Sequence, residues 1–224
     1  MSGRRWPERG SAGVAVLFDV DGTLVDTNYL HTLAWSRALA DAGEWAPMNA
    51  IHRLVGMGGD QLVPHLLGHS NDAVLAARPG RYRELMPEAR VFPGARRLLT
   101  ALARQGAQVV LATSSPKDEL EAMVALLDVG SAISHTTNGD DVDRTKPHAD
   151  VFECALERAG LGPDDAVVVG DSVWDVEAAG RAGIRMVAVE TGGFAAAELR
   201  TAGADAVYHD VGELLDSVKR SERC

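Results

Sequence analysis

Apolar and polar positions follow two different patterns along this chain. Residues 14–18 form a continuous apolar run, which is typical of a strand buried on both faces. From residue 28 to residue 90 the apolar side chains instead recur at helical spacing, as at Leu30, Leu33 and Ala34, and no convincing strand interrupts them. This segment predicts short helices at 28–42, 48–55, 60–67 and 71–86, the first ending at Gly43.

Beyond residue 91 apolar strands alternate with amphipathic helices. The predicted strands are 108–112, 132–135, 166–170, 184–189 and 206–208, and the predicted helices are 95–104, 118–127, 149–159, 173–181, 195–202 and a last one from Val211. This alternation predicts an α/β fold with a doubly wound, Rossmann-like parallel sheet, covered by helices on both faces. Ligands bind such sheets at the carboxyl ends of the strands.

The two patterns together predict the domain organisation. Residues 13–27 and 91–224 form the core domain, and residues 28–90 form an inserted helical domain. The segment Val91–Gly94 is the expected return hinge. We interpret residues 1–12 as a disordered tail, because Arg4 and Arg5 are not followed by the apolar region of an export signal.

Composition excludes several classes of function. No apolar run is long enough to cross a membrane, so a membrane protein is not expected. A net charge of −10 with few lysines argues against a sequence-independent hold on nucleic acid. Cys154 and Cys224 are far apart in the sequence and are expected to be free thiols in a reducing cytoplasm. The oligomeric state, monomer or homodimer, is left open.

Two carboxylates follow the first apolar run, in Asp19-Val20-Asp21-Gly22-Thr23. Alternation along a strand would point Asp19 and Asp21 the same way, and Gly22 allows a sharp turn just after them. Two such carboxylates resist ionisation unless a cation or hydrogen bonds offset their repulsion. A divalent metal would do so, leaving one carboxylate as nucleophile and ligand and the other to handle protons.

This stretch resembles the first motif of the haloacid dehalogenase superfamily. The resemblance implies that Asp19 is the nucleophile that becomes an aspartyl-phosphate and that Asp21 is the general acid and base. The inserted helices at 28–90 resemble the small helical cap of the phosphoglycolate phosphatase-like and β-phosphoglucomutase-like branch. The closure of such a cap excludes water and selects the substrate.

Two further motifs suit a phosphoryl group. Thr113 and Ser114 follow the strand 108–112, and Thr113 matches the second motif of the superfamily. Hydroxyl and backbone N–H groups there would bind phosphoryl oxygens, although an ordinary helix cap has the same composition. Lys146, in Thr145-Lys146-Pro147, resembles the superfamily's Lys-Pro motif and would offset negative charge near the nucleophile. A solvated surface lysine is the alternative.

The fourth motif is Gly170-Asp171-Ser172-Val173-Trp174-Asp175, which matches the superfamily's metal motif. Mg²⁺ prefers oxygen ligands and keeps several waters, so it needs few direct carboxylates. Asp171 is the expected direct ligand, together with the Asp19 carboxylate and the Asp21 backbone carbonyl. Asp175 is not expected to bind the metal directly. It would instead hold a metal-bound water or orient Lys146. An acidic helix start with no metal is the alternative.

Individual residues exclude related chemistries. Haloacid dehalogenases proper lack the second aspartate of the first motif, so Asp21 favours phosphoryl transfer. The Schiff-base chemistry of phosphonoacetaldehyde hydrolase-like members needs a cap lysine, but the lysines here are Lys117, Lys146 and Lys219, and none lies in the cap.

The stretch Asp26–His31 resembles the hinge of β-phosphoglucomutase and of many phosphatases. Thr27 and His31 therefore mark the hinge, and His31 either steadies Asp21 or simply packs in its helix.

The glycine-rich stretch 54–60 separates mutase from phosphatase. The mutases have a lysine and an arginine where this chain has Val55 and Gly59, so a cap that binds a second phosphate is not expected.

Charges in the segment 28–90 balance, with six arginines and six acids. Arg53 is the candidate specificity contact, and an ordinary surface arginine is the alternative.

These observations predict a Mg²⁺-dependent phosphatase of a small phosphorylated metabolite, phosphoglycolate-like or sugar-phosphate-like. The reaction would pass through an aspartyl-phosphate. A β-phosphoglucomutase-like phosphosugar mutase is the alternative within the superfamily. A non-catalytic binding or regulatory protein on the same fold is the alternative from another class, and the intact set of carboxylates counts against it.

Overall fold

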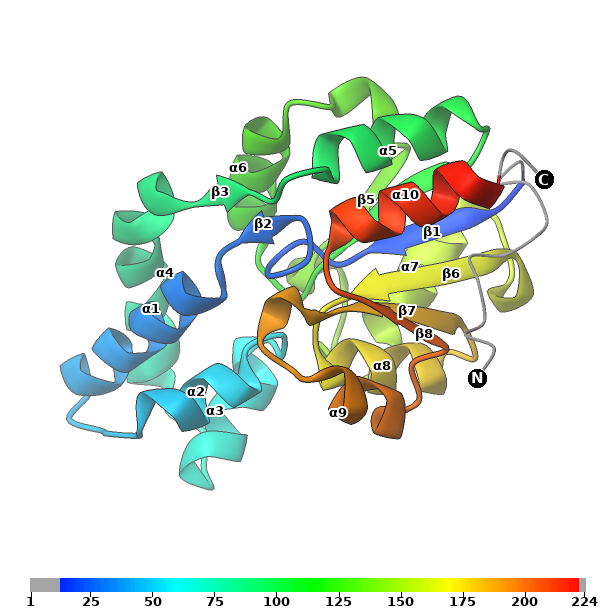
Figure 1. Ribbon diagram of the computed structural model, residues 1–224. Coiled ribbons are helices and arrows are strands. Elements are labelled where there is room, and N and C mark those ends of the chain that lie inside the picture. Colours follow the sequence, from blue (N-terminus) through cyan, green and yellow to red (C-terminus); the bar gives the residue numbers. More distant parts are fainter. Residues whose placement is uncertain (1–12, 222–224) are drawn as a thin grey trace.

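The computed structural model describes residues 13–221, and within them six strands form one parallel sheet (Figure 1). The spatial order is β5-β4-β1-β6-β7-β8. The strands are β1 (Ala15–Phe18), β4 (Gln108–Ala112), β5 (His135–Thr137), β6 (Ala166–Gly170), β7 (Arg185–Val189) and β8 (Ala206–Tyr208). The predicted doubly wound α/β fold is confirmed.

The adjacent strands β4, β1 and β6 end within one residue of one another. Phe18 of β1 is in register with Leu111 of β4 and with Val169 of β6. The side chains of β1 and β6 are buried throughout, which explains their unbroken apolar runs. Because parallel strands deliver their carboxyl ends to one edge, the residues that follow β1, β4 and β6 meet there.

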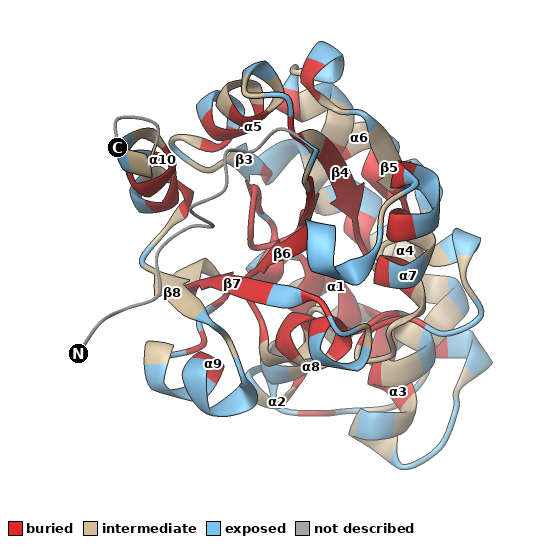
Figure 2. Cartoon of the chain, turned by 90° about the vertical axis from the view of Figure 1, so that its right-hand side faces the viewer, coloured by how far each residue is buried: buried red, intermediate tan, exposed pale blue. Residues whose placement is uncertain are grey.

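Helices cover both faces of the sheet, as Figure 2 shows by the buried strands between more exposed helices. One face packs against α5 (Ala95–Arg104), α6 (Lys117–Leu127) and α10 (Val211–Ser221). The other packs against α7 (Asp150–Ala159), α8 (Val173–Arg181) and α9 (Ala196–Ala202). Alternate side chains of β1 pack into the two hydrophobic cores, Val16 and Phe18 on one face of the sheet and Ala15 and Leu17 on the other.

The segment predicted as an inserted domain, here called the helical insertion (28–90), lies beside the carboxyl edge of the sheet (Figure 1). Its helices are α1 (Asn28–Asp41), α2 (Met48–Leu54), α3 (Gly59–Leu67) and α4 (Asp72–Leu85), followed by the 3-10 helix η1 (Met86–Glu88). They share an apolar cluster that includes Trp35, Ile51 and Val63. The strands β2 (Val25–Asp26) and β3 (Arg90–Val91) pair antiparallel where the chain enters and leaves the insertion.

The predicted strand at 132–135 is wrong, because Gly130–Ala132 is the 3-10 helix η2 and β5 begins only at His135. Pairing with β4 sets this edge strand, from Val110 opposite His135 to Ala112 opposite Thr137. The apolar Ile133, which precedes β5, packs against the core. Further 3-10 helices are η3 (Gly139–Asp141), η4 (Pro163–Asp165) and η5 (Glu190–Gly192).

Some predictions concern residues outside the part that the structure describes. The tail at 1–12 and the thiol of Cys224 lie beyond residues 13–221. Cys154 is half-buried and is a free cysteine. None of the helices within 13–221 combines the length and the apolar composition that crossing a membrane would require.

Candidate active site

The turn after β1 brings the first motif against the fourth. Gly22 has a φ of +75°, and a Cβ built on it would lie 2.3 Å from both Asn28 Nδ2 and Asp171 Oδ2. Any larger residue would therefore be strained and would clash. The tight turn lets Thr23 Oγ1 and Asn28 Nδ2 each donate a hydrogen bond of 2.9 Å to the Asp171 carboxylate.

Lys146 lies between two carboxylates. Its Nζ is 2.5 Å from Asp19 Oδ1 and 2.8 Å from Asp175 Oδ1, and the lysine side chain is 0% exposed. Burial disfavours the charged ammonium, but the carboxylates of Asp175 and Asp19 outweigh that cost and raise the pKa of Lys146. Ser172 holds the other oxygen of Asp175, with Oγ at 2.6 Å and backbone N at 3.1 Å. The ammonium is therefore fixed beside Asp19.

Three buried carboxylates gather at this point. Oxygens of Asp19, Asp171 and Asp175 all lie within 4.8 Å of one another. Burial, reinforced by the charge of Asp175, raises the pKa of Asp171 to about 7. Burial also raises the pKa of Asp19, and the ammonium of Lys146 opposes this only in part. Oxygen donors with excess negative charge are what Mg²⁺ prefers, so these residues fit a divalent cation.

Asp21 is held by a different set of groups. Thr27 Oγ1 at 2.7 Å and His31 Nε2 at 2.8 Å contact its Oδ1, and Ser115 Oγ donates to Oδ2 at 2.8 Å. Thr113 Oγ1 lies 3.4 Å from the same Oδ2. Burial works against the charged form, yet His31 and the hydroxyl donors lower the pKa of Asp21 well below its usual range. Asp21 is thus held in its charged form by directed hydrogen bonds.

His31 connects Asp21 to a buried ion pair. Its Nδ1 contacts the guanidinium of Arg78, which also pairs with Glu119 of α6. Arginine only donates hydrogen bonds, so His31 Nδ1 is the acceptor and the ring hydrogen lies on Nε2, where it is donated to Asp21. Tyr82 stacks on the His31 ring at a centroid distance of 4.2 Å. The position of His31 is therefore fixed on three sides.

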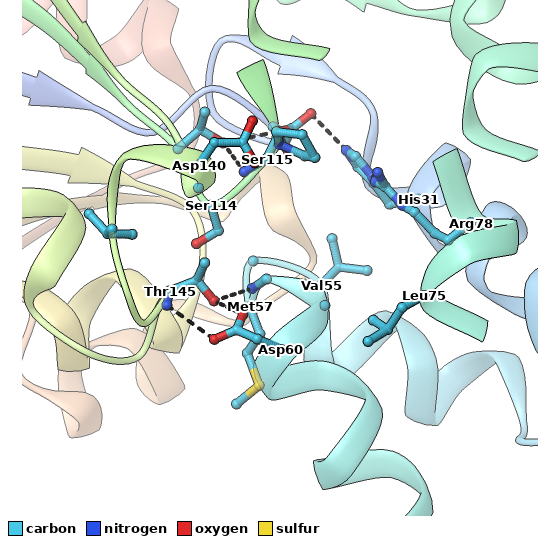
Figure 3. A pocket seen from close by; sticks show the side chains of 18 of the residues that line it. His31, Val55, Met57, Asp60, Leu75, Arg78, Ser114, Ser115, Asp140 and Thr145 are labelled. Atoms are coloured by element: carbon cyan, nitrogen blue, oxygen red, sulfur yellow. Dashed lines mark hydrogen bonds and ion pairs between the residues drawn. The ribbon is translucent and has the colours of Figure 1, made fainter. Parts of the chain in front are cut away.

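A pocket of about 340 Å³ opens between the core and the helical insertion. Figure 3 shows its walls, with Ser114, Ser115 and Thr145 on the core side and His31, Leu75 and Arg78 on the other. Asp19, Asp21 and Thr113 also line it. The two aspartates of the first motif therefore face a space that a small molecule could fill.

The family of the chain follows from its match to a known model. The model of haloacid dehalogenase-like hydrolases matches residues 14–183. The chain belongs to this family. The matched range runs from β1 through α8, so it contains every site residue described above.

Individual members of the family are similar to this chain over most of its length. A phosphoglycolate phosphatase of Rhodospirillum rubrum is 33% identical over 217 residues, which are 90% of this chain and 89% of that protein. A validoxylamine A 7'-phosphate phosphatase of Streptomyces hygroscopicus subsp. limoneus is 30% identical over 181 residues, or 78% and 84% of the two chains. The crystal structure of a hydrolase from Pseudomonas syringae has a TM-score of 0.87 and 31% identity, covering 92% and 98%. The predicted superfamily and the predicted class of enzyme, a phosphoric monoester hydrolase, are confirmed.

The structure of this haloacid dehalogenase-like hydrolase brings most of the predicted site residues together. Ser114 lies on the pocket wall, where its Oγ accepts a hydrogen bond of 3.3 Å from the backbone N of Lys146. Arg53 lies elsewhere. It is exposed, 2.6 Å from Glu198 Oε1 and 4.0 Å above the Phe194 ring, and it is not among the residues that line the pocket.

Several residues of this site were not anticipated from the sequence. Ser115 and Thr145 adjoin predicted residues, so their positions were a usable signal. In the sequence, Arg78 is one of six arginines between residues 28 and 90, and no motif distinguishes it from the others. Glu119, which pairs with it from α6, carries no motif and lies 41 positions away along the chain. Only the packing of α4 against α6 brings these two residues together.

Proposed function

We propose that this family member is a Mg²⁺-dependent phosphatase that hydrolyses a small phosphorylated metabolite through an aspartyl-phosphate on Asp19. The observation that carries the proposal is the arrangement of the first motif in the pocket. Asp19 is paired with the Lys146 ammonium at 2.5 Å, while Asp21 is held by separate hydrogen-bond donors. This arrangement supports attack by one carboxylate and proton transfer by the other.

The two carboxylates would act in sequence. In the first step an oxygen of Asp19 attacks phosphorus, the bond to the alcohol oxygen breaks, and Asp21 gives that oxygen a proton. Asp21 would take up this proton when the anionic phosphate group of the substrate lies beside it, because a neighbouring negative charge raises the pKa of a carboxyl. In the second step Asp21 takes a proton from the water that attacks the phosphoryl group on Asp19. Phosphate leaves, Asp19 is regenerated, and Asp21 again carries the proton that the first step needs. His31 and Thr27 orient Asp21 in both steps.

Other residues would hold the phosphoryl group and the metal. Thr113, Ser114 and Lys146 would bind phosphoryl oxygens. Asp171 and Asp19 would hold Mg²⁺ with the Asp21 backbone carbonyl, and Asp175 would orient Lys146, as its 2.8 Å contact supports. The metal, when bound, supplies positive charge that stabilises the phosphoryl oxygens. Three buried carboxylates, two of them in contact with the Lys146 ammonium, support this assignment.

The helical insertion would act as the cap of the site. Its residues form one wall of the pocket, which suits exclusion of water during the reaction. The relatives differ in substrate, since one is named for phosphoglycolate and another for validoxylamine A 7'-phosphate. The proposal therefore extends to small phosphate esters as a class. The half-buried free thiol of Cys154 suits the cytoplasm as the place of action.

Phosphate release from an aryl phosphate and from a panel of small esters tests the function. We expect activity with Mg²⁺, loss on chelation, and loss in the variant Asp19→Asn. The control is Asp164→Asn, an exposed residue of η4 ahead of β6, at the opposite edge of the sheet. Near-normal turnover by Asp19→Asn would overturn the assignment of the nucleophile.

A further inference from the structure

The pocket contains little positive charge with which to bind a second anionic group. Among the described residues that line it, Arg78 is the one lysine or arginine side chain. Lys146 is fully buried beside Asp19 and is not part of the wall. An anionic group on the alcohol part of a substrate would therefore depend on Arg78.

The charge of Arg78 is already compensated. Its guanidinium forms an ion pair with Glu119, and the two residues are 7% and 6% exposed. A second nitrogen contacts His31, and the guanidinium carbon lies 4.6 Å from the centre of the Tyr82 ring. Since a buried carboxylate in contact cancels the field of the cation at longer range, Arg78 contributes shape and hydrogen bonding without a net positive charge.

Acidic side chains surround the mouth of the same pocket. Asp60, Asp140 and Asp143 line it and are exposed. Asp60 and Asp140 accept hydrogen bonds, from Thr145 and from the backbone N of Lys117, but neither forms an ion pair with a lysine or arginine among the described residues. The potential at the mouth is therefore negative.

The rest of the insertion wall offers no alternative anion site. Trp35, Val55, Met57 and Leu75 make this part of the wall apolar. The N-terminus of α3 also reaches the pocket, but its first turn already carries Asp60, whose carboxylate meets the positive end of the helix. A carboxylate or phosphate placed here would lose its water without gaining a cation, which is costly.

We propose that the site prefers phosphate monoesters whose alcohol part is uncharged or carries an amine over esters whose alcohol part carries a carboxylate or a second phosphate. The preference rests on the proposed phosphatase function and specifies its substrate class. Phosphoglycolate itself, with a carboxylate next to the ester carbon, would be a poor substrate. The negative mouth and the compensated Arg78 are the two features that produce the discrimination.

Matched esters test the preference in the Mg²⁺-loaded enzyme. We would compare hydroxyethyl phosphate and aminoethyl phosphate with phosphoglycolate, and glycerol phosphate with phosphoglycerate, at one ionic strength. We expect kcat/KM for the uncharged and amine-bearing esters to exceed that for their carboxylated counterparts by at least about tenfold. Equal or higher values for the carboxylated esters would overturn the substrate class while leaving the phosphatase in place. No release from any of these esters or from an aryl phosphate would instead overturn the phosphatase function.

Two variants ask whether the named charges cause the preference. Glu119→Gln keeps the shape of the side chain but removes the negative charge that compensates Arg78. We therefore expect the ratio of kcat/KM for phosphoglycolate to kcat/KM for hydroxyethyl phosphate to rise about three- to tenfold. Asp143→Asn, at the exposed mouth, should raise the ratio to a smaller extent and does not depend on the buried pair. The control is Asp118→Asn, which makes the same change of net charge next to Glu119 but outside the pocket wall, 3.7 Å from Arg83. An unchanged ratio in both test variants would overturn the proposal.

Discussion

Thr145 and Asp60 are hydrogen-bonded across the boundary between the core and the helical insertion. The Thr145 hydroxyl and backbone N both contact the Asp60 carboxylate, and Gly58 N donates to Thr145 Oγ1 at 3.1 Å (Figure 3). A Cβ on Gly58 would lie 2.3 Å from Thr145 Oγ1, so the two segments approach as closely as a glycine permits. Since Thr145 directly precedes Lys146, the position of the insertion is linked to the ammonium beside Asp19.

Replacing Thr145 by valine should weaken this link. The variant Thr145→Val keeps the shape but loses the hydroxyl bond to a charged acceptor, which is worth about 1.5–3 kcal/mol. We expect kcat/KM for a small phosphate ester to fall by roughly one order of magnitude or more. The control Thr201→Val removes an exposed hydroxyl that bonds to Ala197 O on α9. An unchanged kcat/KM in Thr145→Val would show that the hydrogen bond between Thr145 and Asp60 does not contribute to catalysis.

Lys146 should contribute to stability as well as to activity. In Lys146→Met the carboxylates of Asp19 and Asp175 lose their ammonium, and breaking a buried ion pair costs about 3–5 kcal/mol. We expect the free energy of unfolding of the chelated protein to fall by that amount and phosphatase activity to be lost. Denaturant unfolding without metal measures the first effect. Lys219→Met, which removes a lysine from the last turn of α10, should leave both properties near wild type.

The central part of the fold could be predicted because its pattern is unambiguous. β1, β4 and β6 are apolar runs buried by helices on both faces, and such runs have few other interpretations. The edge strand β5 was misplaced because His135, Thr136 and Thr137 carry no apolar signal. Its position depends on backbone pairing with β4, which side-chain pattern does not record.

The site could be predicted only where strand ends deliver it. Asp19, Lys146 and Asp171 belong to motifs near the carboxyl edge of the sheet, and the structure brings them together there. The contacts made by the insertion are different. The pair of Arg78 and Glu119 depends on how one helix rests against another, and nothing in the sequence near either residue encodes that contact.

Asp141 should make stability depend on pH at the acidic end. The hydrogen bond from Arg158, which outweighs partial burial, lowers the pKa of the Asp141 carboxyl, and Asn138 N donates to it at 2.9 Å. A carboxyl with a lowered pKa stabilises the fold above its unfolded pKa of about 4 and loses that effect as pH falls through the folded value. Asp141→Asn should therefore destabilise the protein by about 0.5–1 kcal/mol at pH 7 and by less near pH 3, as measured by urea unfolding. An equal loss at both pH values would contradict the ionic origin.

Mg²⁺ should stabilise the folded protein, independently of turnover. The carboxylates of Asp19, Asp171 and Asp175 repel one another in a buried site, and the pKa of Asp171 is raised to about 7 by burial and by its neighbour. A cation that binds only the folded state adds about 2.7 kcal/mol at a concentration one hundred times its Kd. We expect the Tm of the chelated protein to rise as Mg²⁺ is added, and Asp171→Asn to lose most of that rise, because Thr23 and Asn28 would then hold an amide in place of a ligand. The control Asp164→Asn should keep the full rise in Tm. An Asp171→Asn protein that gains as much from Mg²⁺ as the wild type would place the cation elsewhere.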